Sequence, residues 1–179
     1  MNVLQWRPDW FPNGSVPDSP FLVFGISEEY PLDRDLLEKR YRQLSLLVHP
    51  DFADKCINRE EVLKISARVN SAYRLLRSPF QTLLWLGSEK FGSDFNPSGV
   101  KPKPEFLMEM MEKQDEIAAL DGSIQASLSI KNEILTVQSS LLSQMSEALK
   151  AQNCELMSLL VVEYNYYERL RINLEGKFA

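Results

Sequence analysis

The chain has 179 residues, enough for one domain or two small ones, and its 44% apolar and 25% charged side chains are typical of a soluble globular protein. The net charge of −5 leaves no clustered positive charge of the kind that a general nucleic-acid binder needs. One histidine and two distant cysteines, Cys56 and Cys154, argue against a zinc site, a disulfide framework and a cysteine–histidine nucleophile.

The first 14 residues contain two prolines and lack the apolar core of a signal peptide. No run approaches the roughly 20 apolar residues that a membrane-spanning helix needs. We therefore expect a cytoplasmic protein that does not enter a membrane. Glycine is scarce and alternating apolar patterns are almost absent, so the sequence predicts an all-α fold.

Residues 1–19 hold three prolines and several aromatic residues and predict an irregular leader, after which a short apolar cluster predicts a brief helix that stops at Gly25. A longer helix follows, with Asp33 as its N-cap. Pro50 ends this helix, because the residue before a proline is pushed out of helical geometry. The apolar stripe of this helix recurs at steps of four, three and four residues: Leu37, Tyr41, Leu44 and Val48.

A second long helix is predicted after the loop over 49–57. Asn58 and Glu61 resemble a capping box at its start. The two long helices should pack as an antiparallel hairpin, and Ser78 with Pro79 then opens a short helix that we expect to end at Gly87. The stripe of the second long helix is Val62, Ile65, Val69, Ala72 and Leu76.

Residues 91–103 contain glycine and proline without periodicity and predict a linker. Pro104 can start the next helix, and a longer one follows Asp121 and Gly122. A last helix is expected from about Cys154 to Leu174, which makes an antiparallel three-helix bundle with short turns. The apolar stripe of the middle helix is Ile130, Ile134, Val137, Leu141, Met145 and Leu149.

The only histidine stands where the helix that begins after Asp33 must stop, in the tripeptide His49-Pro50-Asp51. At 100° per residue, Lys39 and Arg42 fall opposite the apolar stripe and Arg40 lies on its flank, so a basic face leads to the tripeptide. Proline makes the bend rigid, and Asp51 offers an acceptor to an arginine of a partner. The alternative is a simple helix stop whose histidine favours the helix dipole.

This layout resembles the J domain of the DnaJ co-chaperones, of which His-Pro-Asp between two such helices is the signature. The resemblance implies that a DnaK-type ATPase chaperone, either specialised and HscA-like or general, is bound through the tripeptide and the basic face. Phe52 departs from the lysine or arginine that many J domains carry after the tripeptide. The implied chaperone-binding residues are His49, Pro50, Asp51, Lys39, Arg40 and Arg42.

The glycine/phenylalanine-rich segment and the zinc-binding repeats of many DnaJ proteins are absent from this sequence. Two stretches, "LRSPFQTLLWL" and "FLMEMMEKQDEI", resemble instead the HscB family of co-chaperones of iron–sulfur cluster assembly, over about residues 20–179. The resemblance implies a J domain at 20–90, the linker at 91–103 and a three-helix domain at 104–179 that binds an IscU-like scaffold protein.

The resemblance to the family also implies a scaffold-binding patch, which consists of apolar residues, acidic neighbours and one aromatic residue from the last helix. Tyr166 is the best match for the aromatic residue, and Tyr167 lies beside it in the sequence. The alternative is that Leu107 and Met111 belong to the core. The segment from Phe106 to Met111 is apolar on all sides, so we expect some of its side chains to stay exposed. The implied scaffold-binding residues are Leu107, Met108, Met111, Glu112, Asp115 and Tyr166.

The sequence thus predicts a co-chaperone without chemistry or a cofactor of its own, most simply a monomer, that activates the ATPase of a partner and delivers an iron–sulfur scaffold. A J-domain protein for a different client is the main alternative, because the tripeptide specifies the chaperone and not the cargo. A helical nucleic-acid-binding module is a further alternative, against which the long loop and the net acidity argue.

Overall fold

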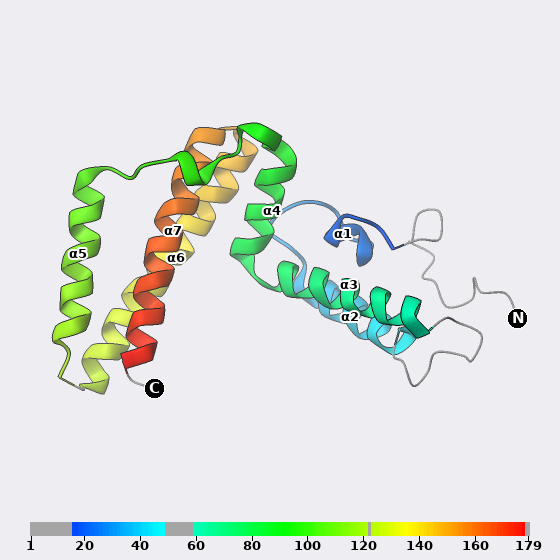
Figure 1. Cartoon of the computed structure of the whole chain (residues 1–179), viewed down its shortest axis with the longest axis horizontal. Helices are drawn as coiled ribbons and strands as arrows, with labels where there is room; N and C mark the ends of the chain where they lie inside the picture. The colour runs from blue at the N-terminus through cyan, green and yellow to red at the C-terminus, as the bar shows by residue number, and fades with distance from the viewer. Residues whose placement is uncertain (1–15, 49–58, 122, 178–179) are drawn as a thin grey trace, which may run out of the picture. The chain divides into compact units, whose positions relative to one another are not determined.

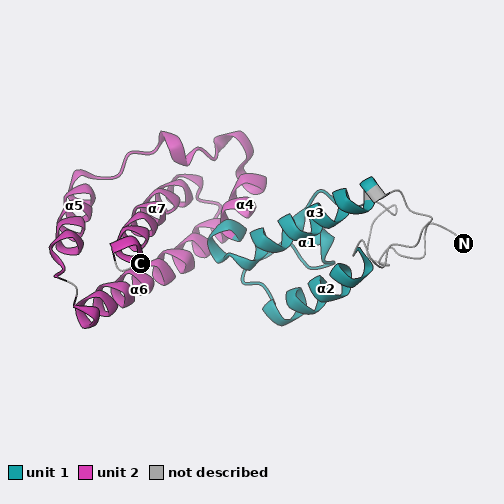
Figure 2. Cartoon of the chain, turned by 60° about the horizontal axis from the view of Figure 1, so that its bottom comes forward, with its two compact units in different colours: residues 1–82 teal, residues 83–179 magenta. Residues whose placement is uncertain are grey.

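The computed structural model describes residues 16–48, 59–121 and 123–177 (Figure 1). Within these ranges the chain forms seven α-helices and two short 3-10 helices without a strand, which confirms the predicted all-α fold. The chain divides into two compact units, residues 1–82 and 83–179, whose boundary falls inside α4 (Pro79–Phe91; Figure 2). The domain limits expected from the sequence stay a prediction.

Unit 1 begins with α1 (Pro20–Val23), which ends before Gly25, a residue with φ of +59° in the left-handed region that favours glycine. The next helix, α2 (Arg34–Leu47), starts as predicted, because Leu36 N donates a hydrogen bond of 2.9 Å to Asp33 Oδ1. Three of its four stripe positions are buried and Tyr41 is half-buried: Leu37, Leu44 and Val48 form the buried set.

The second long helix, α3 (Arg59–Arg77), packs against α2 as the predicted antiparallel hairpin (Figure 1). The ring of Tyr41 stacks on the ring of Tyr73 at a centroid distance of 3.8 Å, and Tyr41 Oη donates a hydrogen bond of 2.9 Å to Asn70 Oδ1. Asn58 lies outside the described residues. The whole predicted stripe of α3 is buried: Val62, Ile65, Val69, Ala72 and Leu76.

Helix α4 starts at Pro79 as predicted but continues through Phe91, so the prediction that it ends at Gly87 is wrong. Gly87 is buried inside the helix. A Cβ atom at this position would lie 3.1 Å from Phe95 Cζ and 3.2 Å from Met157 Cε. The glycine therefore permits close packing of α4 rather than ending it.

Unit 2 contains α5 (Pro104–Ala119), α6 (Ile124–Lys150) and α7 (Cys154–Lys177). Helices α6 and α7 run antiparallel along most of their length, and α5 packs on α7 (Figure 1). Between α4 and α5 the chain forms η3 (Gly92–Asp94) and η4 (Pro97–Gly99), and η4 packs on α7. The core of the bundle consists of apolar side chains from all three helices, chiefly Met110, Ile117, Ile134, Leu141, Met145, Met157, Leu160, Val161, Leu170 and Leu174.

Side-chain hydrogen bonds of the N-cap residues determine where α6 and α7 start. Ala126 N donates to Ser123 Oγ at 3.3 Å at the start of α6, and Leu156 N donates to Asn153 Oδ1 at 3.0 Å at the start of α7.

No helix in the described part of the chain combines the length and the apolar character needed to cross a bilayer.

Candidate partner-binding surfaces

Two of the three predicted chaperone-binding residues on α2 face solvent. Lys39 and Arg42 are exposed and Arg40 is half-buried, as the helical geometry predicts for the side opposite the buried stripe. Beside them Leu46 is 67% exposed. His49-Pro50-Asp51 and Phe52 lie outside the described residues, in the connection between the end of α2 and the start of α3.

A groove of about 540 Å³ lies between α5 and α7 in unit 2. It brings together three of the predicted scaffold-binding residues, Leu107, Met111 and Tyr166, which are far apart in sequence. The ring of Tyr166 meets the ring of Phe106 edge to face at a centroid distance of 5.6 Å. The groove is lined by Leu107, Met110, Met111, Gln114, Tyr166, Arg169, Leu170 and Asn173.

The methionines of α5 separate into a buried and an exposed set. Met110 is 5% exposed, whereas Met108 is 62% and Met111 67% exposed, so Met111 is not a core residue. Leu107 is half-buried at the edge of the groove. The expectation that part of this apolar segment stays exposed is therefore confirmed, and the role of these side chains in binding stays a prediction.

Acidic side chains lie beside this apolar surface on α5, whereas the exposed Arg169 of α7 lines its other side. Glu112 and Asp115, the predicted acidic contacts, are exposed on α5 although they do not line the groove, and Glu116 is exposed nearby. A surface with an apolar centre and an acidic margin on its α5 side is complementary to a partner that presents apolar side chains and, toward α5, basic ones.

A tyrosine–glutamate hydrogen bond ties α5 to α7 outside the groove lining. Tyr167 is buried, and its hydroxyl donates a hydrogen bond of 2.9 Å to Glu109 Oε1. Burial and this bond raise the pKa of Tyr167 far above its ordinary value of 10. Burial, and then the charge of Glu109, also raise the pKa of Glu163 on α7. The protonated tyrosine is thus the form that holds the two helices together.

The sequence interpretation missed the α7 side of the groove beyond Tyr166. Arg169 is exposed, with its Cζ atom 5.7 Å from the centroid of the Tyr166 ring, and Asn173 follows one turn later. The spacing of these three residues, three and then four positions, is the signal that places them on one helical face. Gln114 on α5 could be found in the same way from its spacing to Met111 and Leu107.

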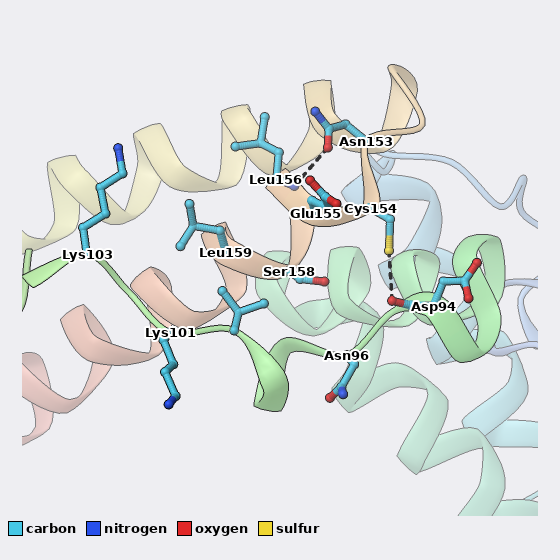
Figure 3. Close-up of a pocket in the computed structure, with 11 residues that line it drawn as sticks. Asp94, Asn96, Lys101, Lys103, Asn153, Cys154, Glu155, Leu156, Ser158 and Leu159 are labelled. Atoms are coloured by element: carbon cyan, nitrogen blue, oxygen red, sulfur yellow. Dashed lines mark hydrogen bonds between the residues drawn. The ribbon is translucent and has the colours of Figure 1, made fainter.

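A second pocket, of about 570 Å³, lies where the segment after α4 packs on the start of α7 (Figure 3). Cys154 Sγ donates a hydrogen bond of 3.3 Å to the carbonyl oxygen of Asp94, which ties this segment to α7. The mouth carries charges of both signs, Lys101 and Lys103 with Glu155. Across the described ranges, no three histidine, cysteine or acidic side chains are grouped so that they could hold a metal ion.

Comparisons with known proteins agree with this arrangement. Residues 102–175 match the family model described as the HSCB C-terminal oligomerisation domain. Among solved structures, the human co-chaperone protein HscB aligns with a TM-score of 0.81 at 23% identity, covering 96% of this chain and 91% of that one. Chaperone HscB from Vibrio cholerae aligns with a TM-score of 0.71, also at 23% identity, covering 89% and 96%. These likenesses show the fold: a J domain followed by a helical bundle.

Sequence relatives extend the agreement over most of the chain. The co-chaperone protein HscB homolog of Neisseria gonorrhoeae is 26% identical over 156 residues, which cover 84% of this chain and 93% of the relative. The homolog of Bordetella avium is 30% identical over 143 residues, which cover 78% of this chain and 80% of the relative. The chain therefore belongs to the HscB family of co-chaperones.

Proposed function

We propose that this chain is a J-domain co-chaperone that stimulates ATP hydrolysis by a DnaK-type chaperone and delivers an iron–sulfur cluster scaffold protein to it. Its membership of the HscB family supports both halves of the proposal. The chain itself performs no covalent step: it binds two proteins and changes the rate of a reaction that one of them catalyses.

The chaperone half rests on α2 and the tripeptide that follows it. Lys39 and Arg42 project into solvent, where positive charge increases the rate of encounter with an acidic partner surface. Pro50 restricts the backbone between His49 and Asp51, and the carboxylate of Asp51 can accept a charge-assisted hydrogen bond from an arginine of the chaperone. The basic face increases the rate of association with the chaperone, and the tripeptide makes the specific contact.

The observation that carries the client half is the exposure of Met108 and Met111 beside the α5–α7 groove. Unbranched methionine side chains adapt to a partner surface and bury apolar area when covered. Leu107 and Tyr166 supply more rigid apolar contacts in the groove. The acidic Glu112 and Asp115 next to this patch would select a scaffold that presents basic side chains beside an apolar centre.

Holding both partners on one chain gives the co-chaperone its effect. Once the scaffold is bound to unit 2 and the chaperone to unit 1, the scaffold meets the chaperone at an effective concentration of about millimolar for a short tether. Stimulation by the J domain alone should therefore be smaller than stimulation in the presence of scaffold.

Single-turnover ATP hydrolysis by the DnaK-type chaperone tests the chaperone half. His49→Gln and Asp51→Asn should remove the stimulation while circular dichroism shows an unchanged helix content. Asp54→Asn makes the same charge change three residues later and should stimulate like the original chain. Full stimulation by well-folded His49→Gln and Asp51→Asn proteins would refute this half.

A pull-down from lysate of the native organism tests the client half. The full chain should recover one DnaK-type ATPase and an iron–sulfur scaffold protein together, and Met111→Ala should lose the scaffold but keep the ATPase. Recovery of the ATPase with a different client would keep the co-chaperone function and replace the cargo.

A further inference from the structure

Arg169 lines the α5–α7 groove and has no carboxylate partner among the residues that the structure describes. The other two basic side chains of α7 are engaged inside unit 2. Arg171 pairs with two glutamates of its own helix, and Lys177 Nζ donates a hydrogen bond of 2.9 Å to the carbonyl oxygen of Ile117. The residues three and four positions from Arg169 along α7 are all neutral: Asn165, Tyr166, Ile172 and Asn173. The described part of unit 2 therefore leaves the charge of Arg169 unneutralised at the groove.

The side chain of Arg169 is nevertheless oriented. Its Cζ atom lies 5.7 Å from the centroid of the Tyr166 ring, which in turn meets the ring of Phe106 on α5 at 5.6 Å. A guanidinium over an aromatic ring uses its flat face for that contact, so the N–H groups at its edge stay available. These N–H groups match the two oxygens of a carboxylate. The groove thus presents an oriented donor for an acidic group.

Arg169 lies between an apolar and a polar end of the groove. Helices α5 and α7 run in the same direction, and two contacts, one near each end of α5, join residues that are 60 positions apart (Figure 1). In this register Leu107 lies level with Tyr166, and Gln114 lies level with Asn173 about 10 Å further along the helices. A partner in the groove therefore meets apolar side chains at one end, amides at the other and the guanidinium between them.

A partner that covers the exposed Met111 also covers Arg169, because both line the same groove. Removing a guanidinium from water without an anionic partner costs free energy and lowers the affinity. A carboxylate on the partner offsets this cost through a charge-assisted pair, whereas a basic group there adds repulsion. Glu112 and Asp115 on α5 do not line the groove, so the carboxylate has to come from the partner.

We propose that Arg169 is a specificity-determining residue of the α5–α7 groove and pairs with a carboxylate of the scaffold protein. The inference rests on the proposed client and deepens it, because it assigns opposite charges to two sides of the scaffold surface. The apolar centre of that surface covers Leu107 and Met111, and its basic side chains lie toward Glu112 and Asp115. Its carboxylate lies toward α7, so a scaffold with basic side chains on both sides is rejected.

Calorimetric titration of the full chain with the iron–sulfur scaffold protein of the same organism tests the pairing. Arg169→Gln removes the charge and should raise the dissociation constant about tenfold. Lys150→Gln removes one positive charge at an exposed position at the end of α6, outside the groove, and should leave the dissociation constant unaltered. Both variants should keep the thermal melt of the original chain, since both positions are exposed.

The titration separates this inference from the proposed function. Equal affinity of Arg169→Gln and the original chain would overturn the role of Arg169 and leave the scaffold as the client. An original chain that stimulates the chaperone but does not bind the scaffold would refute the client, and the inference with it.

Charge exchange identifies the contact. Each exposed aspartate and glutamate of the scaffold is changed in turn to lysine and titrated against the original chain and against Arg169→Glu. One scaffold variant should bind Arg169→Glu more tightly than it binds the original chain, and a double-mutant cycle should show the two changes to be coupled. If no scaffold variant has this preference, Arg169 does not pair with a carboxylate and the proposal is wrong.

Discussion

Met110 and Met111 are adjacent in the sequence, yet Met110 is 5% exposed and Met111 is 67% exposed. Both line the α5–α7 groove, Met110 from the core side and Met111 from the solvent side. This pair separates the two readings of the apolar segment at the start of α5, because one methionine stabilises the bundle and the other is available to a partner.

Substituting each methionine by alanine should therefore have opposite effects. Met110→Ala leaves a cavity and should lower the free energy of unfolding by about 2–5 kcal/mol. Met111→Ala should change the thermal melt little and weaken scaffold binding in calorimetric titration by about tenfold or more, as for a residue at the centre of an interface. Unchanged affinity of a well-folded Met111→Ala protein would move the client site away from this groove.

Charge reversal on α2 should slow association with the chaperone. Lys39→Glu with Arg42→Glu removes positive charge from the exposed face, so the stopped-flow association rate should fall and become less dependent on salt. The dissociation rate should change less. Lys64→Glu with Arg74→Glu makes the same change in net charge at exposed positions of α3 and serves as the control. Equal slowing by both pairs would mean that only net charge matters.

The two helical glycines Gly87 and Gly176 should respond differently to alanine. A Cβ atom at Gly87 would lie 3.1 Å from the Phe95 ring, whereas one at Gly176 would meet nothing within 4 Å. Gly176→Ala should raise the free energy of unfolding by up to about 1 kcal/mol through helix propensity. Gly87→Ala should lose that gain to overpacking, which typically costs about 1–3 kcal/mol. Chemical denaturation measures both, and an equal stabilisation would mean that the Phe95 ring moves away freely.

Acid should destabilise unit 2 partly through Glu168. Hydrogen bonds from Arg171, at 2.6 Å and 3.0 Å, lower the pKa of Glu168 below its ordinary 4.5, and a bond from Gln138 adds to this. Because the folded-state pKa is the lower one, this stabilisation is complete above about pH 4.5 and is lost as the pH falls through the folded-state value.

Urea denaturation between pH 3 and pH 7 should reveal the contribution of Glu168. The difference in stability between the original chain and Glu168→Gln should be largest near neutral pH and shrink below pH 4.5. Glu163 has a raised pKa and acts in the opposite direction, but it is present in both proteins and cancels in the difference. A difference that does not depend on pH would show that Glu168 contributes only through packing.

Local patterns in the sequence are sufficient to predict most helix starts and the buried stripes of α2 and α3. Asp33, Ser123 and Pro104 act on backbone groups within one turn, and the α3 stripe from Val62 to Leu76 is buried as its periodicity predicts. Such signals depend on residues three or four positions apart, so they can be read without a tertiary structure. The prediction that α4 ends at Gly87 is wrong because this glycine makes room for the ring of Phe95 inside the helix packing. The ring reaches Gly87 only after the chain turns back, so the local sequence does not reveal the contact.

The sequence by itself determined the all-α class, the basic face of α2 and, through its resemblance to HscB, the set of Leu107, Met111 and Tyr166. Only the tertiary structure decided which α5 methionine is buried, that Arg169 and Asn173 share the groove, and that the charges of Lys131 and Glu133 are neutralised by α7 and α5. The physical reason is that α5 is apolar on several sides, so its own periodicity does not specify which side faces the core. Contact with α7, some 50 residues later in the chain, determines that side.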